Sequence, residues 1–187
     1  MEKLAAQFYT VREFTKNAKD FAKTCKRVKK IGYDGVQLSA IGPIPPKEIQ
    51  KILSGEGLEC VATHISFDRI EKETNAVIDE HLMWGCRYPA IGGFFPQGGT
   101  GLKLKTWKDF VKRFNKCAAL LAEAGLSLGY HNHFHEFLKL PDGLTCYEHL
   151  IRELDPFNAW FEIDTYWVAY AGKEPSALIR RLPHRVP

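Results

Sequence analysis

Hydrophobic and polar positions alternate along this chain with two different periods. Short apolar runs with a period of two residues predict strands, and longer stretches with apolar residues three and four positions apart predict amphipathic helices. The predicted strands are residues 4–9, 36–39, 59–64, 88–92, 126–131 and 160–164. The predicted helices are residues 14–30, 45–54, 67–84, 106–124, 145–154 and 174–182.

This regular succession of strand and helix predicts an α/β fold with a parallel sheet and helical crossovers. A doubly wound sheet and a (β/α)₈ barrel both fit the pattern. The barrel is favoured because Tyr9-Thr10-Val11-Arg12, rather than a glycine-rich phosphate loop, follows the first strand. A barrel has eight strands and typically about 250 residues. We therefore predict one TIM-barrel-type domain over residues 1–187 that lacks the last two βα units.

Side-chain alternation places a polar set on the inward face of the predicted strands. Tyr130 and its apolar neighbours at alternate positions suit a helix layer, so the intervening residues should point into the barrel. Because buried polar groups are costly without partners, such a set near one end of the strands indicates a wet cavity. The inward residues are Gln7, Tyr9, Gln37, His64, Ser127, Gly129, His131, His133, Trp160, Glu162 and Asp164.

Composition narrows the class of protein. Hydrophobic residues make up 45% of the chain and charged residues 26%, as in soluble globular domains. The net charge of +4 is modest, so no nucleic-acid partner is expected. Five cysteines, an odd number with no C-x-x-C spacing, favour a reducing compartment. Without a signal-peptide pattern or a run long enough to span a bilayer, we predict a cytoplasmic protein with no membrane partner.

The segment Gly129-Tyr130-His131-Asn132-His133-Phe134-His135-Glu136-Phe137 concentrates the chain's chemistry, and Phe161-Glu162-Ile163-Asp164-Thr165-Tyr166-Trp167 follows one βα unit later. Each segment includes the polar end of a predicted buried strand. Neighbouring strand ends supply one shared site in a barrel. Histidine, aspartate and glutamate are ligands for a divalent cation. These two segments therefore predict a metal site.

These segments resemble the sugar phosphate isomerase/epimerase superfamily, the xylose-isomerase-like TIM barrels. The opening residues 6–12, the turn at 31–37, His64, and the spacing Glu162-x-Asp164-x-x-Trp167 carry the same resemblance. It implies a sugar or sugar derivative as substrate and a divalent ion (Mn, Mg, Co or Zn). The family's fifth-strand carboxylate position falls on His131 and its sixth-strand position on Asp164. The seventh- and eighth-strand ligands would lie beyond Pro187.

The hypothesised reaction is proton transfer beside a sugar carbonyl through an enediolate. His131, Glu136 and Glu162 are the candidate catalytic residues, and His131 and Asp164 are the candidate metal ligands. Candidate substrate contacts are His64, His133, Trp167, Gln37 and Tyr9. For His131, His64 and Asp164 an interior, hydrogen-bonded role is the alternative. His133 and Glu136 either reach the substrate or order the strand exit. Glu162 either orients His131 or pairs with a neighbouring strand. Trp167 either forms a wall for the sugar or packs in the core.

Three functional classes remain open from the sequence. The first is a metal-dependent sugar isomerase or epimerase, or a related lyase of keto-sugars or inososes. The second is a sugar-binding remnant without activity. The third is an endonuclease of the same superfamily, disfavoured because Trp167 stands where a further histidine ligand is needed. Phe94, Phe95 and Pro96 could roof the pocket, and residues 98–101 are a weak candidate for an anion nest. A homo-oligomer stays open.

Overall fold

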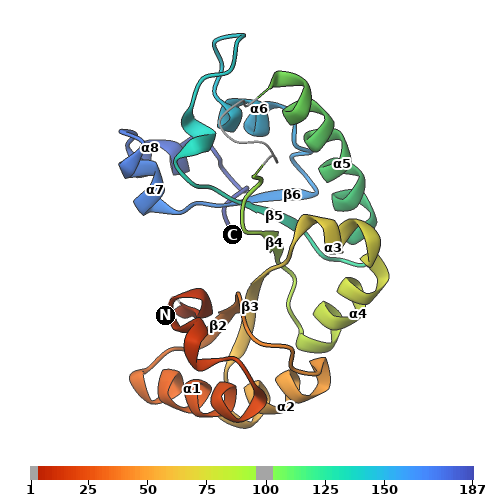
Figure 1. The fold of residues 1–187 in the computed structure, drawn as a ribbon, viewed down its shortest axis with the longest axis vertical. Helices are drawn as coiled ribbons and strands as arrows, with labels where there is room; N and C mark the ends of the chain where they lie inside the picture. The colour runs from red at the N-terminus through yellow and green to blue at the C-terminus, as the bar shows by residue number, and fades with distance from the viewer. Residues whose placement is uncertain (1–3, 96–102) are drawn as a thin grey trace. The chain divides into compact units, whose positions relative to one another are not determined.

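The computed structural model describes residues 4–95 and 103–187 of this 187-residue chain. The chain divides into two compact units, Met1–Pro89 and Ala90–Pro187. Each unit is built from parallel strands that alternate with helices (Figure 1). The predicted α/β fold with parallel strands is therefore confirmed.

The first unit contains three parallel strands in chain order. β1 pairs with β2, and β2 pairs with β3. Its elements are β1 (Ala5–Gln7), η1 (Phe8–Phe14), α1 (Ala18–Ile31), β2 (Gly35–Leu38), α2 (Pro46–Glu56), β3 (Glu59–His64), α3 (Phe67–Lys72) and α4 (Thr74–Trp84). The apolar faces of α1 and α2 pack against β2 and β3 around Phe21, Val36 and Ile49, which are almost fully buried. The core of this unit thus lies between its strands and its helices.

The second unit repeats the arrangement. β5 pairs in parallel with β4 on one side and with β6 on the other. Its elements are β4 (Pro89–Ile91, beginning at the last residue of the first unit), α5 (Leu104–Glu123), β5 (Leu128–His131), η2 (His135–Phe137), α6 (Cys146–Glu153), β6 (Ala159–Glu162), α7 (Thr165–Tyr170) and α8 (Pro175–Arg180). Four glycines in its described loops and helix ends have a positive φ, and one of them, Gly125, follows α5 as predicted.

Aromatic side chains of α5 fill the core of the second unit. Trp107, Phe110 and Phe114 are fully buried. The Tyr130 ring on β5 lies 5.9 Å from that of Phe110 and 6.5 Å from that of Trp107, measured between centroids. Tyr130 therefore faces the helix layer, as side-chain alternation predicts, and the next residue, His131, faces the opposite side of the strand.

The predicted helix over residues 67–84 is wrong in one respect, because two helices occupy this range. α3 ends at Lys72 and α4 begins at Thr74, with Glu73 between them at φ −128° and ψ 35°. The Thr74 hydroxyl donates a hydrogen bond of 2.7 Å to the Ile70 carbonyl. Such a side-chain bond competes with the backbone ladder and favours a helix boundary.

The N-terminal elements also differ from the prediction. The first strand ends at Gln7 instead of residue 9, because the Thr10 hydroxyl donates to the Gln7 carbonyl and a 3₁₀ turn begins. Tyr9 therefore lies outside the strand, and its side chain is 50% exposed. The first long helix begins at Ala18, not at residue 14, because Asn17 caps it by accepting from the Asp20 N–H.

The sixth strand is shorter than predicted at its carboxyl end. It ends at Glu162 rather than residue 164, and the unpredicted helix α7 begins at Thr165. Asp164 is the N-cap residue of α7, and its carboxylate accepts from the Trp167 N–H at 3.2 Å. The direction of the Asp164 side chain is therefore set by a helix cap and not by strand alternation.

Two further sequence expectations remain. Pro96 and the glycine-rich segment 98–101 lie outside the described residues. Among the helices in the described ranges, none combines the length and apolar character that crossing a bilayer requires.

Candidate functional site

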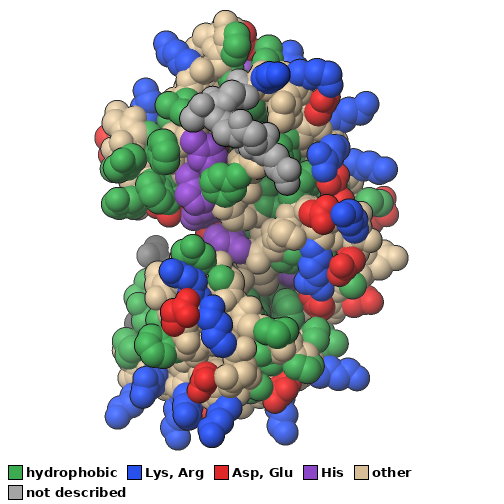
Figure 2. Space-filling model, viewed as in Figure 1, with side chains coloured by type: hydrophobic (Ala, Val, Ile, Leu, Met, Phe, Trp, Pro, Cys, Tyr) green, Lys and Arg blue, Asp and Glu red, His purple; other side chains and the backbone are tan. Residues whose placement is uncertain are grey.

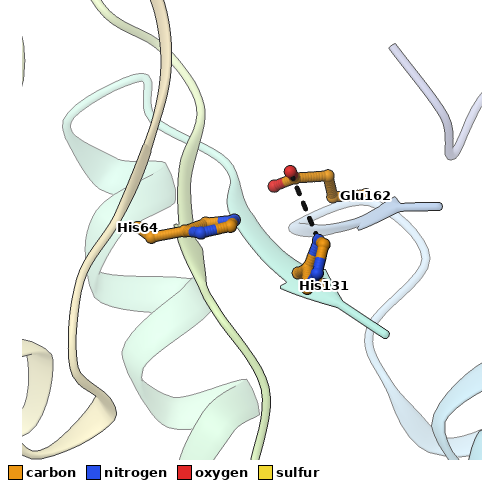
Figure 3. A group of neighbouring side chains, drawn as sticks. All are labelled: His64, His131 and Glu162. Carbon is orange, nitrogen blue, oxygen red and sulfur yellow. Dashed lines mark ion pairs between the residues drawn. The ribbon is translucent and has the colours of Figure 1, made fainter. Parts of the chain in front are cut away.

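The ends of β5 and β6 bring an imidazole and a carboxylate together. His131 and Glu162 are register partners on these two adjacent strands, so both side chains leave the same face. His131 Nδ1 lies 3.4 Å from Glu162 Oε1 (Figure 3). The His131 side chain is only 7% exposed, and that of Glu162 is 20% exposed. The pair is thus largely sheltered from water yet open along one edge.

Asp164 lies on the other side of the same imidazole. Its Oδ2 is 3.6 Å from His131 Nε2, and its side chain is 26% exposed. His131 is therefore flanked by a carboxylate at each ring nitrogen. The structure brings together three of the residues that the sequence singled out, His131, Glu162 and Asp164.

Asn132 clamps Asp164 in place, although the sequence argument assigned it no role. The Asp164 N–H donates to Asn132 Oδ1 at 2.9 Å, and Asn132 Nδ2 donates to the Asp164 carbonyl at 3.3 Å. Asn132 is fully buried. This reciprocal pair ties the chain after β5 to the chain after β6. In the sequence, the signal for this role was an asparagine between two histidines at the end of a predicted buried strand, because an amide can satisfy a backbone donor and a backbone acceptor at once.

Glu136, a candidate catalytic residue, is fully buried within η2. Its Oε1 accepts from the Tyr130 hydroxyl at 2.8 Å, and its Oε2 accepts from the His133 N–H at 2.7 Å. The Tyr130 hydroxyl in turn accepts from the Phe94 N–H at 3.1 Å. Burial, with the nearby Glu136 charge, raises the pKa of Tyr130 well above its usual value. This geometry favours the ordering role, the second of the two interpretations of Glu136.

Three histidine rings form a row beyond the end of β5. The His133 ring centroid lies 5.0 Å from that of His131 and 5.7 Å from that of His135. Figure 2 shows histidine side chains gathered on the face of the second unit beside a group of hydrophobic side chains. Rings of Phe95 and Trp167 contact His133 at 5.2 and 5.5 Å. The candidate substrate contacts His133 and Trp167 thus lie together.

The environments of His133 and His135 shift their pKa values in opposite directions. Burial lowers the pKa of His133, which outweighs the neighbouring Glu136 charge. Burial also opposes the charge on His135, but its hydrogen bond with the Glu136 carboxylate, 3.1 Å away, leaves the pKa of His135 raised. The lowered pKa therefore favours the neutral form of His133 near neutral pH, whereas the raised pKa favours the charged form of His135. His133, His135 and Glu136 also hold ligand-type atoms within 4.8 Å of one another.

The remaining candidates lie in the first unit. Gln37 on β2 is 7% exposed. His64 ends β3, and its Nδ1 lies 3.0 Å from the Ser39 hydroxyl. His64 also lines a cavity of about 290 Å³ within this unit, together with Leu38, Thr63 and Trp84. Tyr9 stacks beneath the Arg12 guanidinium at 4.3 Å. Of these three residues, His64 lies at a strand end that opens into a cavity.

No family model and no curated protein matches this sequence. Solved structures do. Two sugar phosphate isomerase/epimerases from Parabacteroides distasonis give TM-scores of 0.84 and 0.83 at 20% and 22% identity. The matches cover 99% and 100% of this chain and 73% and 77% of those chains. A family 2 AP endonuclease from Brucella melitensis gives 0.71 at 16% identity, covering 100% of this chain and 77% of that chain.

These likenesses confirm the predicted fold. The chain has the α/β architecture of the xylose-isomerase-like TIM barrels, as the resemblance of its motifs implied. At such low identity the likeness concerns the fold alone. The same fold hosts different chemistries, so function has to be argued from the site.

Proposed function

We propose that this chain catalyses proton transfer beside the carbonyl group of a sugar, as an isomerase or epimerase. The observation that carries the proposal is the His131 imidazole held between the carboxylates of Glu162 and Asp164, at 3.4 and 3.6 Å from opposite ring nitrogens. Imidazole gains and loses protons near neutral pH, which suits it to general acid–base catalysis. The similarity to two sugar phosphate isomerase/epimerase structures supports the same reaction class.

The three side chains divide the work by position. Glu162 faces His131 Nδ1, so its carboxylate orients the ring and stabilises the imidazolium that forms when Nε2 takes a proton. His131 Nε2 faces Asp164, whose side chain is the more exposed of the two carboxylates. In the proposed step, Nε2 removes the proton from the carbon beside the carbonyl, and the C–H electron pair forms the enediolate. Return of this proton to the former carbonyl carbon, with transfer of the hydroxyl proton from the first carbon's oxygen to the former carbonyl oxygen, isomerises the sugar. Delivery of a proton from water to the opposite face of the first carbon, while Nε2 passes the proton it removed to water, epimerises it.

In the alternative arrangement, His131 Nε2 and Asp164 would hold a divalent cation instead, because the one lone pair of Nε2 cannot bind an ion and take up a proton together. Two donors that share one tetrahedral ion, each about 2.1 Å from it, stand about 3.4 Å apart. The 3.6 Å separation of His131 Nε2 and Asp164 Oδ2 agrees with that value. Mixed imidazole and carboxylate donors suit zinc, manganese or cobalt, whereas magnesium prefers ligands that are all oxygen atoms. When bound, such an ion would polarise the sugar carbonyl.

The remaining candidates receive supporting roles in this proposal. The lowered pKa favours the neutral form of His133, which lies beside His131. Its ring can therefore donate a hydrogen bond to a substrate hydroxyl or accept one from it. Trp167 supplies an apolar wall next to it. Glu136 orders the segment that carries His133 through its bond with the His133 N–H.

The proposal is tested by deuterium exchange. The protein is incubated in D₂O with a panel of aldoses and ketoses, with Mn²⁺, Co²⁺, Zn²⁺ or Mg²⁺ or with a chelator, and NMR follows exchange at the carbon beside the carbonyl. We expect exchange with at least one sugar. Asp164→Asn should reduce its rate by about 10²-fold or more, while asparagine still caps α7. Phe157→Ala, at a side chain that is 91% exposed, is the matched control.

Failure of every sugar in this panel, extended to reducing disaccharides, to exchange in the unmodified protein would overturn the proposed catalysis. Binding of a sugar without exchange would then identify the second class, a sugar-binding protein without activity. Cleavage of abasic-site DNA in the same preparations would instead favour the endonuclease class, to which one of the similar structures belongs.

A further inference from the structure

Four aromatic side chains of the second unit form one continuous surface beside the candidate site. We call this surface the aromatic platform, and it consists of Phe134, Tyr166, Trp167 and Tyr170. Three of its members lie on α7, where Tyr170 follows Trp167 by three residues and Tyr166 by four, so that Tyr170 shares a helical face with each of them. Centroid distances within the platform run from 4.9 Å for Tyr166–Trp167 to 6.1 Å for Tyr166–Tyr170.

The platform is exposed to an extent that calls for a physical explanation. Tyr166 is 64% exposed, Tyr170 is 65% exposed and Phe134 is 42% exposed. Leaving such rings in water forgoes about 25 cal/mol for each Å² of apolar surface. A contiguous exposed apolar patch marks an interaction site more often than isolated apolar residues do.

Ring contacts connect the platform to the candidate site. Trp167 touches Tyr170 at 5.6 Å on one side and His133 at 5.5 Å on the other. His133 in turn touches His131 at 5.0 Å. The Trp167 N–H also donates to the Asp164 carboxylate, so the first turn of α7 holds a site residue and a platform residue together. A ligand whose reacting part lies at His131 can therefore extend over these rings.

The size of the platform decides between a small ligand and a second copy of the chain. Three partly exposed rings of about 200 Å² each offer on the order of 350 Å² at the quoted exposures. A stable protein interface needs about 800 Å² from each partner. The area suits one further ring of a small ligand. Two members of the platform are tyrosines, and their hydroxyl groups suit a ligand that also carries hydroxyl groups.

We propose that the aromatic platform binds a second sugar ring, so that the substrate is a reducing disaccharide, whose ring with the free carbonyl form reacts, and not a free monosaccharide. This inference rests on the proposed function for the identity of the reacting ring. The flat C–H face of the second ring lies on Tyr166 and Tyr170, and its hydroxyl groups reach water or the tyrosine hydroxyls. The contribution of each aromatic contact is expected to be about threefold to tenfold in affinity.

The test compares disaccharides with matched single-ring probes. Dissociation constants for cellobiose and maltose, and for D-glucose as the single-ring match of their reducing ring, are measured by NMR titration. We expect at least one disaccharide to bind about threefold to tenfold more tightly than its single-ring match. Tyr170→Ala should remove this preference, whereas Tyr170→Phe, which keeps the ring, should retain it. Phe157→Ala is the control for loss of an exposed ring outside the platform.

Each outcome decides the inference separately from the proposed function. A preference below twofold in the unmodified protein, no detectable binding, or a preference that survives Tyr170→Ala overturns it. Self-association that Tyr170→Ala abolishes in analytical ultracentrifugation also overturns it, in favour of a second copy. Deuterium exchange on a monosaccharide without any disaccharide preference leaves the proposed function standing and removes only the platform. A disaccharide preference that depends on Tyr170, found without deuterium exchange, supports the platform and removes the proposed function.

Discussion

Two histidines end two strands of this molecule, and their neighbours give them different chemistry. His64 ends β3 in the first unit and has the Ser39 hydroxyl at its Nδ1. His131 ends β5 in the second unit and has the carboxylates of Glu162 and Asp164 at its two nitrogens. A hydroxyl can orient an imidazole, but a carboxylate also stabilises its protonated form. The side chain at the strand end is thus the same, and the adjacent strand decides what it can do.

The same substitution at the two histidines gives the largest expected difference in activity. His131→Asn should reduce the rate of deuterium exchange by about 10²- to 10⁴-fold, because it removes the proposed proton-transferring group. His64→Asn should leave the rate within about tenfold and act mainly on the apparent KM. Both rates are measured with the sugar that the unmodified protein turns over. Equal losses in the two variants would contradict the contrast drawn between the two strand ends.

The next effect concerns how the second unit holds Asp164. Asn132→Ala removes the partner of the partly buried N–H and carbonyl of Asp164. The free energy of unfolding should fall by about 1–3 kcal/mol, measured by urea denaturation, and exchange activity should fall with it.

A matched control for Asn132 exists in the same unit. Asn115 makes an equivalent clamp, donating to the Glu153 carbonyl at 2.8 Å and accepting from the Asp155 N–H at 3.0 Å. Asn115→Ala should lower stability in the same direction and leave the exchange activity of the folded protein unchanged. If both variants lose activity in proportion to stability, Asn132 has no specific part in positioning Asp164.

The smallest effect is a pH dependence of stability within the histidine row. Because the pKa of His135 is raised in the folded state, its charged pair with Glu136 stabilises the fold fully below the unfolded pKa of about 6.5. That stabilisation is lost as the pH rises through the folded pKa. His135→Gln should therefore cost up to about 1 kcal/mol at about pH 6 and less at about pH 9.

The measurement is urea denaturation of both proteins at the two pH values. The equivalent change at His81 of the first unit should show the opposite trend, because burial lowers the pKa of His81. His81 is fully buried, with Nε2 at 2.8 Å from the Thr63 hydroxyl and Nδ1 at 2.7 Å from the Val77 carbonyl. A stability difference for His135→Gln that does not change with pH would show that its pairing with Glu136 is not electrostatic.

Local pattern alone was enough for the order of strands and helices and for the face on which His131 lies. The third strand, residues 59–64, has the predicted bounds, because alternation and flanking turn residues agree there. Alternation also placed Tyr130 toward the helices and His131 and Glu162 away from them. A period of two residues determines such faces without knowledge of any partner.

Tertiary structure decided what those residues contact. Register between β5 and β6 paired His131 with Glu162, and no local signal encodes register between distant segments. The cap of α7 and the clamp of Asn132 set the direction of Asp164, beyond the end of the strand that should have carried it. Full burial of Glu136 between Tyr130 and His133 likewise depends on groups that meet only in the folded chain. Residue type along the chain determined which chemistry was available, and long-range packing determined where its atoms meet.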